Sequence, residues 1–248
     1  MGFLNKLGIG LGAAPSREIA RPVHSNGRSQ LPPTAIAIGA PRVPERTESA
    51  RISNGLKELL WNLDGLGRGT LLDLGPAWQT TLSFFIERGF RVSSDDLLRE
   101  WKGFLTEEET RLREDASVRD TVDMTPAGRA TRFLSGNLVY AKGSFDAILL
   151  WDLLDYLEPS LAKLLVSHLT DLLRAGGVVF AMFHSRKPEA FQRYRVADSN
   201  TLQVVSAPAI FPAQKIYQNR EIQDLFQRYR TMRSFVGRDQ LRETLFIK

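Results

Sequence analysis

The chain contains no cysteine among its 248 residues, which excludes disulfide frameworks and thiolate metal sites. Long apolar runs are also missing, because none approaches the roughly 18 residues that a membrane-spanning helix needs. A protein without cysteine is compatible with a reducing compartment, so we expect a cytoplasmic location and no transmembrane segment.

Several sequence motifs that mark well-known chemistries are absent too. The chain has no H-E-x-x-H or other cluster with metal-ligand spacing, and no G-x-S-x-G turn for a nucleophilic serine. We therefore predict no metal site and no hydrolysis by a metal or a serine. The lack of G-x-G-x-x-G disfavours a nicotinamide-dependent oxidoreductase, and the lack of an Asn/Asp-Pro-Pro-Tyr motif disfavours methylation of nucleic-acid bases.

The positive charge of the chain, +5 overall, is concentrated near its two ends. Residues 186–248 carry 12 Lys and Arg against six Asp and Glu, whereas residues 51–185 carry 15 against 19. A cationic segment attracts anionic substrates, membrane surfaces or nucleic acid, but it also describes an ordinary solvated surface, which is the interpretation we prefer. No RNA-binding module is visible, and the sequence indicates neither the partner nor the oligomeric state.

The first 50 residues differ from the rest in composition. They contain stretches such as "LGIGLGAAPSRE" and "RPVHSNGRSQLPPT", rich in Gly, Pro, Ser and Arg and without lasting periodicity. Such a segment cannot bury enough apolar surface to offset the entropy of ordering it, so we expect residues 1–50 to be a disordered tail and residues 51–248 to be the folded domain. The opening "MGFLNK" has Lys6 where a myristoylation signal needs Ser or Thr, and its apolar stretch is too glycine-rich for a signal peptide.

From residue 51 onward, short apolar runs alternate with segments of helical periodicity. Apolar strands without polar alternation, separated by helices, are typical of a parallel sheet covered on both faces. The C-terminal strands, joined by a short polar turn, favour an antiparallel hairpin at the sheet edge. The expected strands are residues 70–74, 90–94, 131–136, 145–151, 178–183, 230–236 and 242–248, and the expected helices are 52–63, 80–89, 97–105, about 159–176 and 220–229.

The stretch "TLLDLGPAWQTT" places an aspartate where the first strand ends and a helix begins. In an open α/β sheet ligands bind at the carboxyl ends of the strands, so Asp73 is well placed, and Gly75 permits close approach of the backbone. Asp95 and Asp96 follow Gly75 by 20 and 21 residues, the interval at which such folds place an acid on a ribose. We favour Asp96, since Asp95 falls where the strand's last inward residue is expected.

Five segments in order, "LLDLGPAWQ", "VSSDDLL", "FLSGNL", "GSFDAILLWDLLDYLEP" and "LLRAGGVVFAMF", closed by the hairpin, resemble a class I S-adenosylmethionine-dependent methyltransferase. The resemblance covers residues 69–248. It implies a Rossmann-like, doubly wound, mostly parallel seven-stranded sheet with a C-terminal antiparallel hairpin and helices on both faces. It also implies S-adenosylmethionine as cofactor and methyl transfer to a small-molecule or macromolecular acceptor that the sequence does not identify.

In the first strand's loop, the resemblance assigns Asp73 and Gly75 to the methionine end of the cofactor, and Asp96 to the ribose. One departure stands in this loop: the family usually has a second glycine where this chain has Ala77. Alanine is tolerated there only with a negative φ angle. Trp78 next to it could offer an aromatic face to the cofactor's sulfonium or belong to the core.

Further along the chain, the resemblance places Asn137 on the adenine amino group and Leu138 beside the adenine ring. Trp151 and Asp152 would border the methyl-transfer pocket. His184 follows the fifth strand and is our candidate for a general base, although a loop histidine without such a task is the simpler interpretation. An alternative to the enzyme is a catalytically inactive binding or scaffold protein that keeps the fold.

Overall fold

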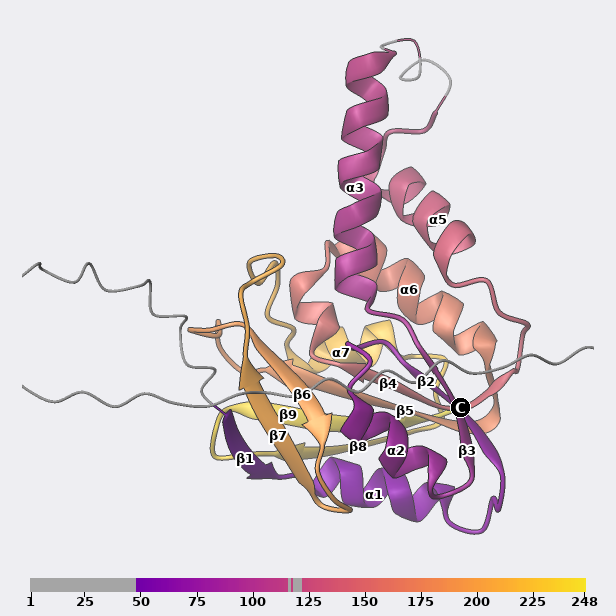
Figure 1. The fold of residues 1–248 in the computed structure, drawn as a ribbon, viewed down its shortest axis with the longest axis vertical. Helices are drawn as coiled ribbons and strands as arrows, with labels where there is room; N and C mark the ends of the chain where they lie inside the picture. Colours follow the sequence, from indigo (N-terminus) through magenta and orange to yellow (C-terminus); the bar gives the residue numbers. More distant parts are fainter. Residues whose placement is uncertain (1–47, 116, 118–121) are drawn as a thin grey trace, which may run out of the picture. The chain divides into compact units, whose positions relative to one another are not determined.

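The computed structural model describes residues 48–115, 117 and 122–248, and a six-stranded sheet forms its centre. The strand order is β3, β2, β4, β5, β9, β8 (Figure 1). The bounds are Gly69–Asp73 for β2, Phe90–Ser94 for β3, Phe145–Trp151 for β4, Leu173–His184 for β5, Thr231–Val236 for β8 and Leu241–Ile247 for β9.

Strands β3, β2, β4 and β5 are parallel, β9 pairs antiparallel with β5, and β8 pairs antiparallel with β9. The chain leaves β2 for β3 on one side, then returns across β2 to build β4 and β5 on the other. The order therefore reverses at β2, where open α/β sheets bind their ligands. The predicted α/β fold and C-terminal hairpin are confirmed, but the sheet has six strands rather than seven.

Helices cover both faces of this sheet (Figure 1). Two helices lie below it in the view, α1 (Asn54–Leu63) and α2 (Gln79–Ile86). Three lie above it, α3 (Leu97–Glu114), α5 (Pro126–Asn137) and α6 (Pro159–Leu172). The short η1 (Leu153–Tyr156) follows β4, and α7 (Asn219–Leu225) precedes the hairpin. Every residue of β4 is buried, as the apolar sequence of that strand predicts.

The predicted strand over residues 131–136 is wrong, and this segment is part of α5. Thr125 caps the helix by accepting a hydrogen bond from the backbone N–H of Gly128, and Pro126 occupies the first turn. Ala130, Phe133 and Leu134 are buried at helical spacing against α6 and α3. The loss of this strand accounts for the missing seventh member of the sheet.

A second, three-stranded antiparallel sheet was not predicted, and we call it the cap sheet. It consists of β1 (Glu48–Ile52), β7 (Thr201–Ser206) and β6 (Gln192–Val196), in that order. The backbone N–H of Val196 donates to the Thr81 hydroxyl at 2.9 Å, which ties β6 to α2. The expected tail lies outside the described residues except for its last three, which belong to β1.

Smaller differences concern where elements end. Helix α3 is continuous to Glu114, whereas the capping-box spacing of Thr106 and Glu109 predicts a separate turn of helix after residue 105. Helix α6 ends at Leu172, and β5 begins directly at Leu173 rather than after the two glycines. None of these differences changes which strand ends meet at the carboxyl edge of the sheet.

Candidate active site

Asp73 is the last residue of β2 and lies fully inside the protein, with 1% of its surface exposed. Its Oδ1 accepts hydrogen bonds from the backbone N–H of Gly75 at 2.9 Å and from the indole Nε1 of Trp151 at 2.6 Å. Its Oδ2 is buried without a partner. Burial raises the pKa of Asp73 to about 6, although the two hydrogen bonds act in the opposite direction. One oxygen of the carboxylate thus lacks a hydrogen-bonding partner.

Trp151, the last residue of β4, fills the space above Gly75. Its φ angle of 51° lies in the left-handed region, which is uncommon for a bulky residue. A Cβ atom added to Gly75 would lie 2.8 Å from the indole Nε1, and the indole stacks at 6.1 Å on the ring of Tyr194. The close approach that Gly75 permits is therefore used by the protein's own tryptophan.

Asp96 lies at the start of α3, two residues beyond the end of β3. Its Oδ1 accepts a hydrogen bond from the Arg193 guanidinium at 3.0 Å, and Arg99 lies 3.9 Å from its Oδ2. Asp95 points elsewhere, since its Oδ2 accepts from the Tyr140 hydroxyl at 2.7 Å. Of the two neighbouring acids, Asp96 lines the cavity described next.

That cavity, which we call the Asp96 cavity, has a volume of about 740 Å³. This is within the range of roughly 300–1,000 Å³ that is usual for small-molecule sites. It lies between the β2–α2 loop, the end of β3, the first turns of α3 and the cap sheet. Its lining residues are Pro76, Ala77, Trp78, Ser94, Asp96, Arg99, Lys102, Phe191, Arg193 and residues 205–210.

The β2–α2 loop accommodates Ala77, which stands where the family usually has a glycine, without backbone strain. Ala77 is not among the described non-glycine residues with positive φ, so the condition for alanine at this position is met. Trp78 occupies the N-cap of α2 and makes no side-chain capping bond, which leaves N–H groups of the first turn without a side-chain partner. The loop therefore presents backbone donors next to the Asp96 cavity.

His184, the last residue of β5, is held by a buried carboxylate that sequence reasoning missed. Its backbone N–H and its ring Nδ1 both lie within hydrogen-bond distance of Asp155 Oδ2, at 2.8 and 2.9 Å. Asp152 Oδ2 lies 3.9 Å from the ring Nε2 and accepts from the Tyr194 hydroxyl at 3.3 Å. Burial raises the pKa of Asp152 to about 7. The sequence signal was the spacing of Asp152 and Asp155, one helical turn apart.

His184 opens onto a second cavity of about 460 Å³, which we call the His184 cavity. Strand β6 separates it from the first, because successive side chains of a strand point to opposite faces. Arg193 and the preceding Phe191 line the Asp96 cavity, whereas Gln192 and Tyr194 line the His184 cavity. The two cavities thus share one wall.

Two predicted adenine neighbours are not brought into either cavity. The Asn137 side chain donates to the carbonyl oxygen of Phe133 at 2.9 Å and lines a different cavity, beside Phe104. Leu138 is buried, and its carbonyl oxygen lies 2.9 Å from His168 Nε2. Both were placed by the assumption of a strand ending at residue 136, and α5 carries them elsewhere.

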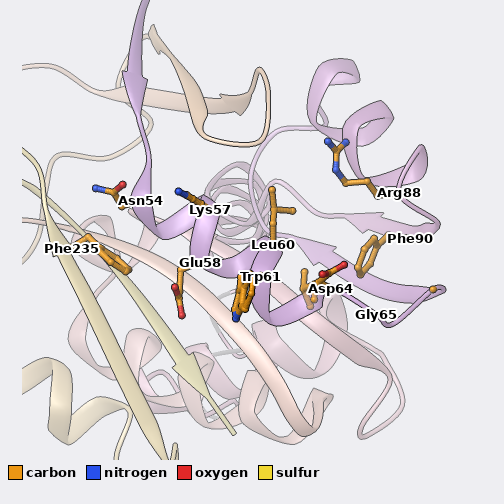
Figure 2. A pocket seen from close by; sticks show the side chains of 12 residues that line it. Asn54, Lys57, Glu58, Leu60, Trp61, Asp64, Gly65, Arg88, Phe90 and Phe235 are labelled. Atoms are coloured by element: carbon orange, nitrogen blue, oxygen red, sulfur yellow. The ribbon is translucent and has the colours of Figure 1, made fainter.

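A larger cavity, about 870 Å³, lies at the amino ends of β2 and β3, beside α1 (Figure 2). Trp61, Phe90 and Phe235 border it, together with Lys57 and Glu58. Because ligands of open α/β sheets bind at the carboxyl ends of the strands, it is not the candidate site. The described part of the chain contains no group of three or more potential metal ligands. It also contains no helix long and apolar enough to cross a membrane.

The order of the parallel strands, with the reversal at β2 and the antiparallel β9 and β8 at the edge, decides the fold class. The fold is a doubly wound, Rossmann-like α/β fold. No protein-family model and no curated protein matches the chain.

Solved structures that are similar to this chain include S-adenosylmethionine-dependent methyltransferases. One is the Burkholderia thailandensis 1,6-didemethyltoxoflavin-N1-methyltransferase with bound 1,6-didemethyltoxoflavin and S-adenosylhomocysteine, at 14% identity and a TM-score of 0.41, covering 78% of this chain and 76% of that one. A methyltransferase from Methanosarcina mazei has 12% identity, a TM-score of 0.39 and coverages of 73% and 93%.

A third is the glycopeptide N-methyltransferase MtfA in complex with S-adenosylmethionine, at 15% identity, a TM-score of 0.38 and coverages of 79% and 94%. Structural similarity at these TM-scores is not evidence for an activity of this chain. The fold class therefore rests on the strand order of this chain, and the acceptors of the three enzymes belong to them.

Proposed function

We propose that this protein is an S-adenosylmethionine-dependent methyltransferase. The observation that carries the proposal is the placement of Asp73 and Asp96 at the carboxyl ends of neighbouring parallel strands. In the β2–β3 register Asp73 is opposite Ser94, which lines the Asp96 cavity together with Asp96. The switch point of the sheet therefore carries two acids, of which Asp96 lines a cavity large enough for a nucleoside.

The chemistry of these residues fits the cofactor. An ionised carboxylate only accepts hydrogen bonds, so Asp96 suits the two ribose hydroxyls. The unpartnered Oδ2 of Asp73 suits the ammonium group of the methionine end, because a buried carboxylate gains most from a nearby cation. When bound, the cofactor supplies a methyl group on a positively charged sulfur.

The protein's own residues would align the acceptor and accept its proton. Holding two reacting atoms in line is itself a large contribution to rate. His184 would be the general base, since Asp155 fixes its ring and its Nε2 faces a cavity. Trp151 must leave the space above Gly75 when the methionine end enters. A cytoplasmic location remains a prediction.

A second candidate function is a methyltransferase-fold binding or scaffold protein without activity. Trp151 and Arg193 favour it, because Trp151 fills the space above Gly75 that the methionine end would enter and Arg193 already occupies one oxygen of Asp96. In this case the contacts of Trp151 with Asp73 and of Arg193 with Asp96 are permanent, and no cofactor replaces them.

Isothermal titration calorimetry with S-adenosylmethionine and S-adenosylhomocysteine separates the two functions. We expect the wild-type protein and Trp151→Ala to bind both ligands, and Asp73→Ala and Asp96→Ala to bind them more weakly. Asp198→Ala, an exposed change in the β6–β7 turn, is the matched control. If neither the wild-type protein nor Trp151→Ala binds either ligand, the enzyme proposal fails. If the ligands bind, transfer of labelled methyl groups into a host extract would identify the acceptor.

A further inference from the structure

Strand β8 is the last strand of the six-stranded sheet, and its outer edge is open. Within the described part of the chain it pairs with β9 alone, and all of its residues except Phe235 are exposed. The outer edge of such a strand presents a row of backbone N–H and C=O groups that can pair with a strand of another chain. The sheet can therefore be extended at β8.

The hydrogen bonds of the β8–β9 hairpin decide which backbone groups of β8 point outward. The N–H of Gly237 donates to the carbonyl oxygen of Leu241 at 3.0 Å, in the same register as the paired strands. In an antiparallel pair, residues that hydrogen-bond to the partner strand alternate with residues that do not. The N–H and C=O groups that point away from β9 are therefore those of Met232, Ser234 and Val236.

This edge lacks the features with which natural proteins protect free strands. Such edges usually carry lysine, proline, a β-bulge or an inward-pointing charge. Strand β8 has the sequence TMRSFV, without lysine or proline, and its register with β9 has no shift. Its charged residue, Arg233, forms an ion pair with Glu58 of α1. Met232 and Val236 are apolar and 38% and 71% exposed. The edge is thus suited to association.

We propose that β8 pairs antiparallel with β8 of a second copy of this chain, about a two-fold axis through Ser234. In this register Ser234 lies opposite the partner's Ser234, and Met232 lies opposite the partner's Val236. The outward-pointing N–H and C=O groups of one copy then meet those of the other. Two sheets of six strands become one continuous sheet of 12. This association is independent of the proposed methyltransferase function.

The side chains of β8 complement those of a second copy in this register. Met232 and Val236 form two apolar pairs across the axis. On the face that carries α1, Arg233 lies opposite the partner's Phe235, so each guanidinium meets an aromatic ring and the two cations stay apart. An axis through Arg233 would instead place the two guanidinium groups opposite each other, and like charges in that position are destabilising. The charge of β8 therefore favours the axis through Ser234.

Sedimentation velocity of the full chain over a range of concentrations tests the dimer, and we expect a reversible monomer–dimer equilibrium. Ser234→Pro removes an outward N–H from each copy and no hydrogen bond to β9, so it should weaken the dimer at least about tenfold. Ser234→Ala is the matched control, because it loses only the contact of the hydroxyl with Thr244 Oγ1 and keeps the N–H. A chain that is monomeric at every concentration, or equal dissociation constants for the two variants, overturns the inference.

Paired charges test the register without changing the backbone. Met232→Lys combined with Val236→Lys places like charges opposite each other twice and should weaken the dimer at least about tenfold. Met232→Glu combined with Val236→Lys places unlike charges at the same positions and should keep the dissociation constant within about threefold of the wild type. Val139→Lys, at an exposed apolar residue outside β8, is the control. Equal weakening by both double variants contradicts the proposed register.

Hydrogen exchange distinguishes a second copy from any other occupant of the edge. The amides of Met232, Ser234 and Val236 should exchange more slowly as the protein concentration rises, because only the dimer covers them. Protection of these amides that is the same at every concentration would mean that something other than a second copy pairs with β8, and it would overturn the inference.

Discussion

At the scale of single residues, the candidate site is defined by charged groups that already have internal partners. Arg193 occupies one oxygen of Asp96, and Trp151 occupies one oxygen of Asp73. A ligand that uses the oxygen contacted by Arg193 or Trp151 has to exchange with that partner, and its net affinity is the difference between two sets of contacts.

Arg193→Met should therefore strengthen the binding of S-adenosylhomocysteine. The substitution keeps the apolar stem, removes the guanidinium from Asp96 and leaves that carboxylate available to the ribose. We expect about a tenfold gain in affinity by calorimetry, the equivalent of about 1.4 kcal/mol. Arg228→Met, which breaks an exposed ion pair with Asp171, is the control and should leave the affinity unchanged. A loss of affinity in Arg193→Met would mean that the guanidinium contacts the ligand itself.

Asp73 should make the protein less stable as the pH rises. Its pKa is about 6 in the folded protein and close to 3.8 when exposed, so the folded state binds the extra proton between these values. Its contribution to stability is complete below pH 4 and is lost as the pH rises to about 6, by about 3 kcal/mol. In urea unfolding, the free energy of unfolding of Asp73→Asn minus that of the wild type should increase by about 3 kcal/mol between pH 4 and pH 7. The exposed Asp64→Asn should show no such change, and a constant difference for Asp73→Asn would refute the effect.

The proposed general-base role of His184 also has a pH signature. Although its burial acts in the opposite direction, the neighbouring carboxylates of Asp155, Asp152 and Asp239 raise its pKa above the ordinary value of 6.5. Arg242 is the cation that faces Asp155. A base must be unprotonated, so methyl transfer should rise with pH through this raised pKa and then level off. Asp155→Asn should move the rise to lower pH, whereas loss of folding alone would lower the rate equally at every pH.

At the scale of elements, helix α5 shows why local apolar content misled the sequence analysis. The run "TRFL" looks like a buried strand, but Thr125 and Pro126 before it form a helix start. Thr125→Ala should cost about 1 kcal/mol of unfolding free energy, because the Gly128 N–H loses its side-chain acceptor. Thr131→Ala, exposed in the middle of the same helix, should cost less than half of that. Equal costs in urea unfolding would argue against the cap.

The cap sheet shows a different limit of prediction from sequence, because part of its strand pairing is long-range. The hairpin of β6 and β7 left a local signal, since "FQRYRV" and "TLQVVS" flank the turn residues "ADSN". The pairing of β1 with β7, however, joins residues about 150 positions apart, and no local pattern reports it. For the same reason the sequence pointed to Asp73 and Asp96, which follow predicted strands, but not to Arg193, whose partner Asp96 lies 97 residues away.

At the scale of the whole molecule, basic residues of the C-terminal segment form ion pairs with carboxylates of the same chain. Five of the 12 basic residues in the C-terminal segment form ion pairs with carboxylates, three of them in the acidic middle segment: Arg193 with Asp96, Arg228 with Asp171 and Arg233 with Glu58. Arg195 pairs with Glu48 and Lys215 with Glu221. The basic isoelectric point therefore reflects internal complementarity as well as surface charge, and it gives little support to a nucleic-acid partner.

The wall shared by the two cavities has a thermodynamic consequence. A ligand that displaces Arg193 on one side of β6 acts on a strand whose next residue, Tyr194, faces the other side. Occupancy of either cavity should then alter the dissociation constant measured in the other, and reciprocity requires both constants to change by the same factor. Titrating each ligand with and without the other would give that factor twice, from two independent directions.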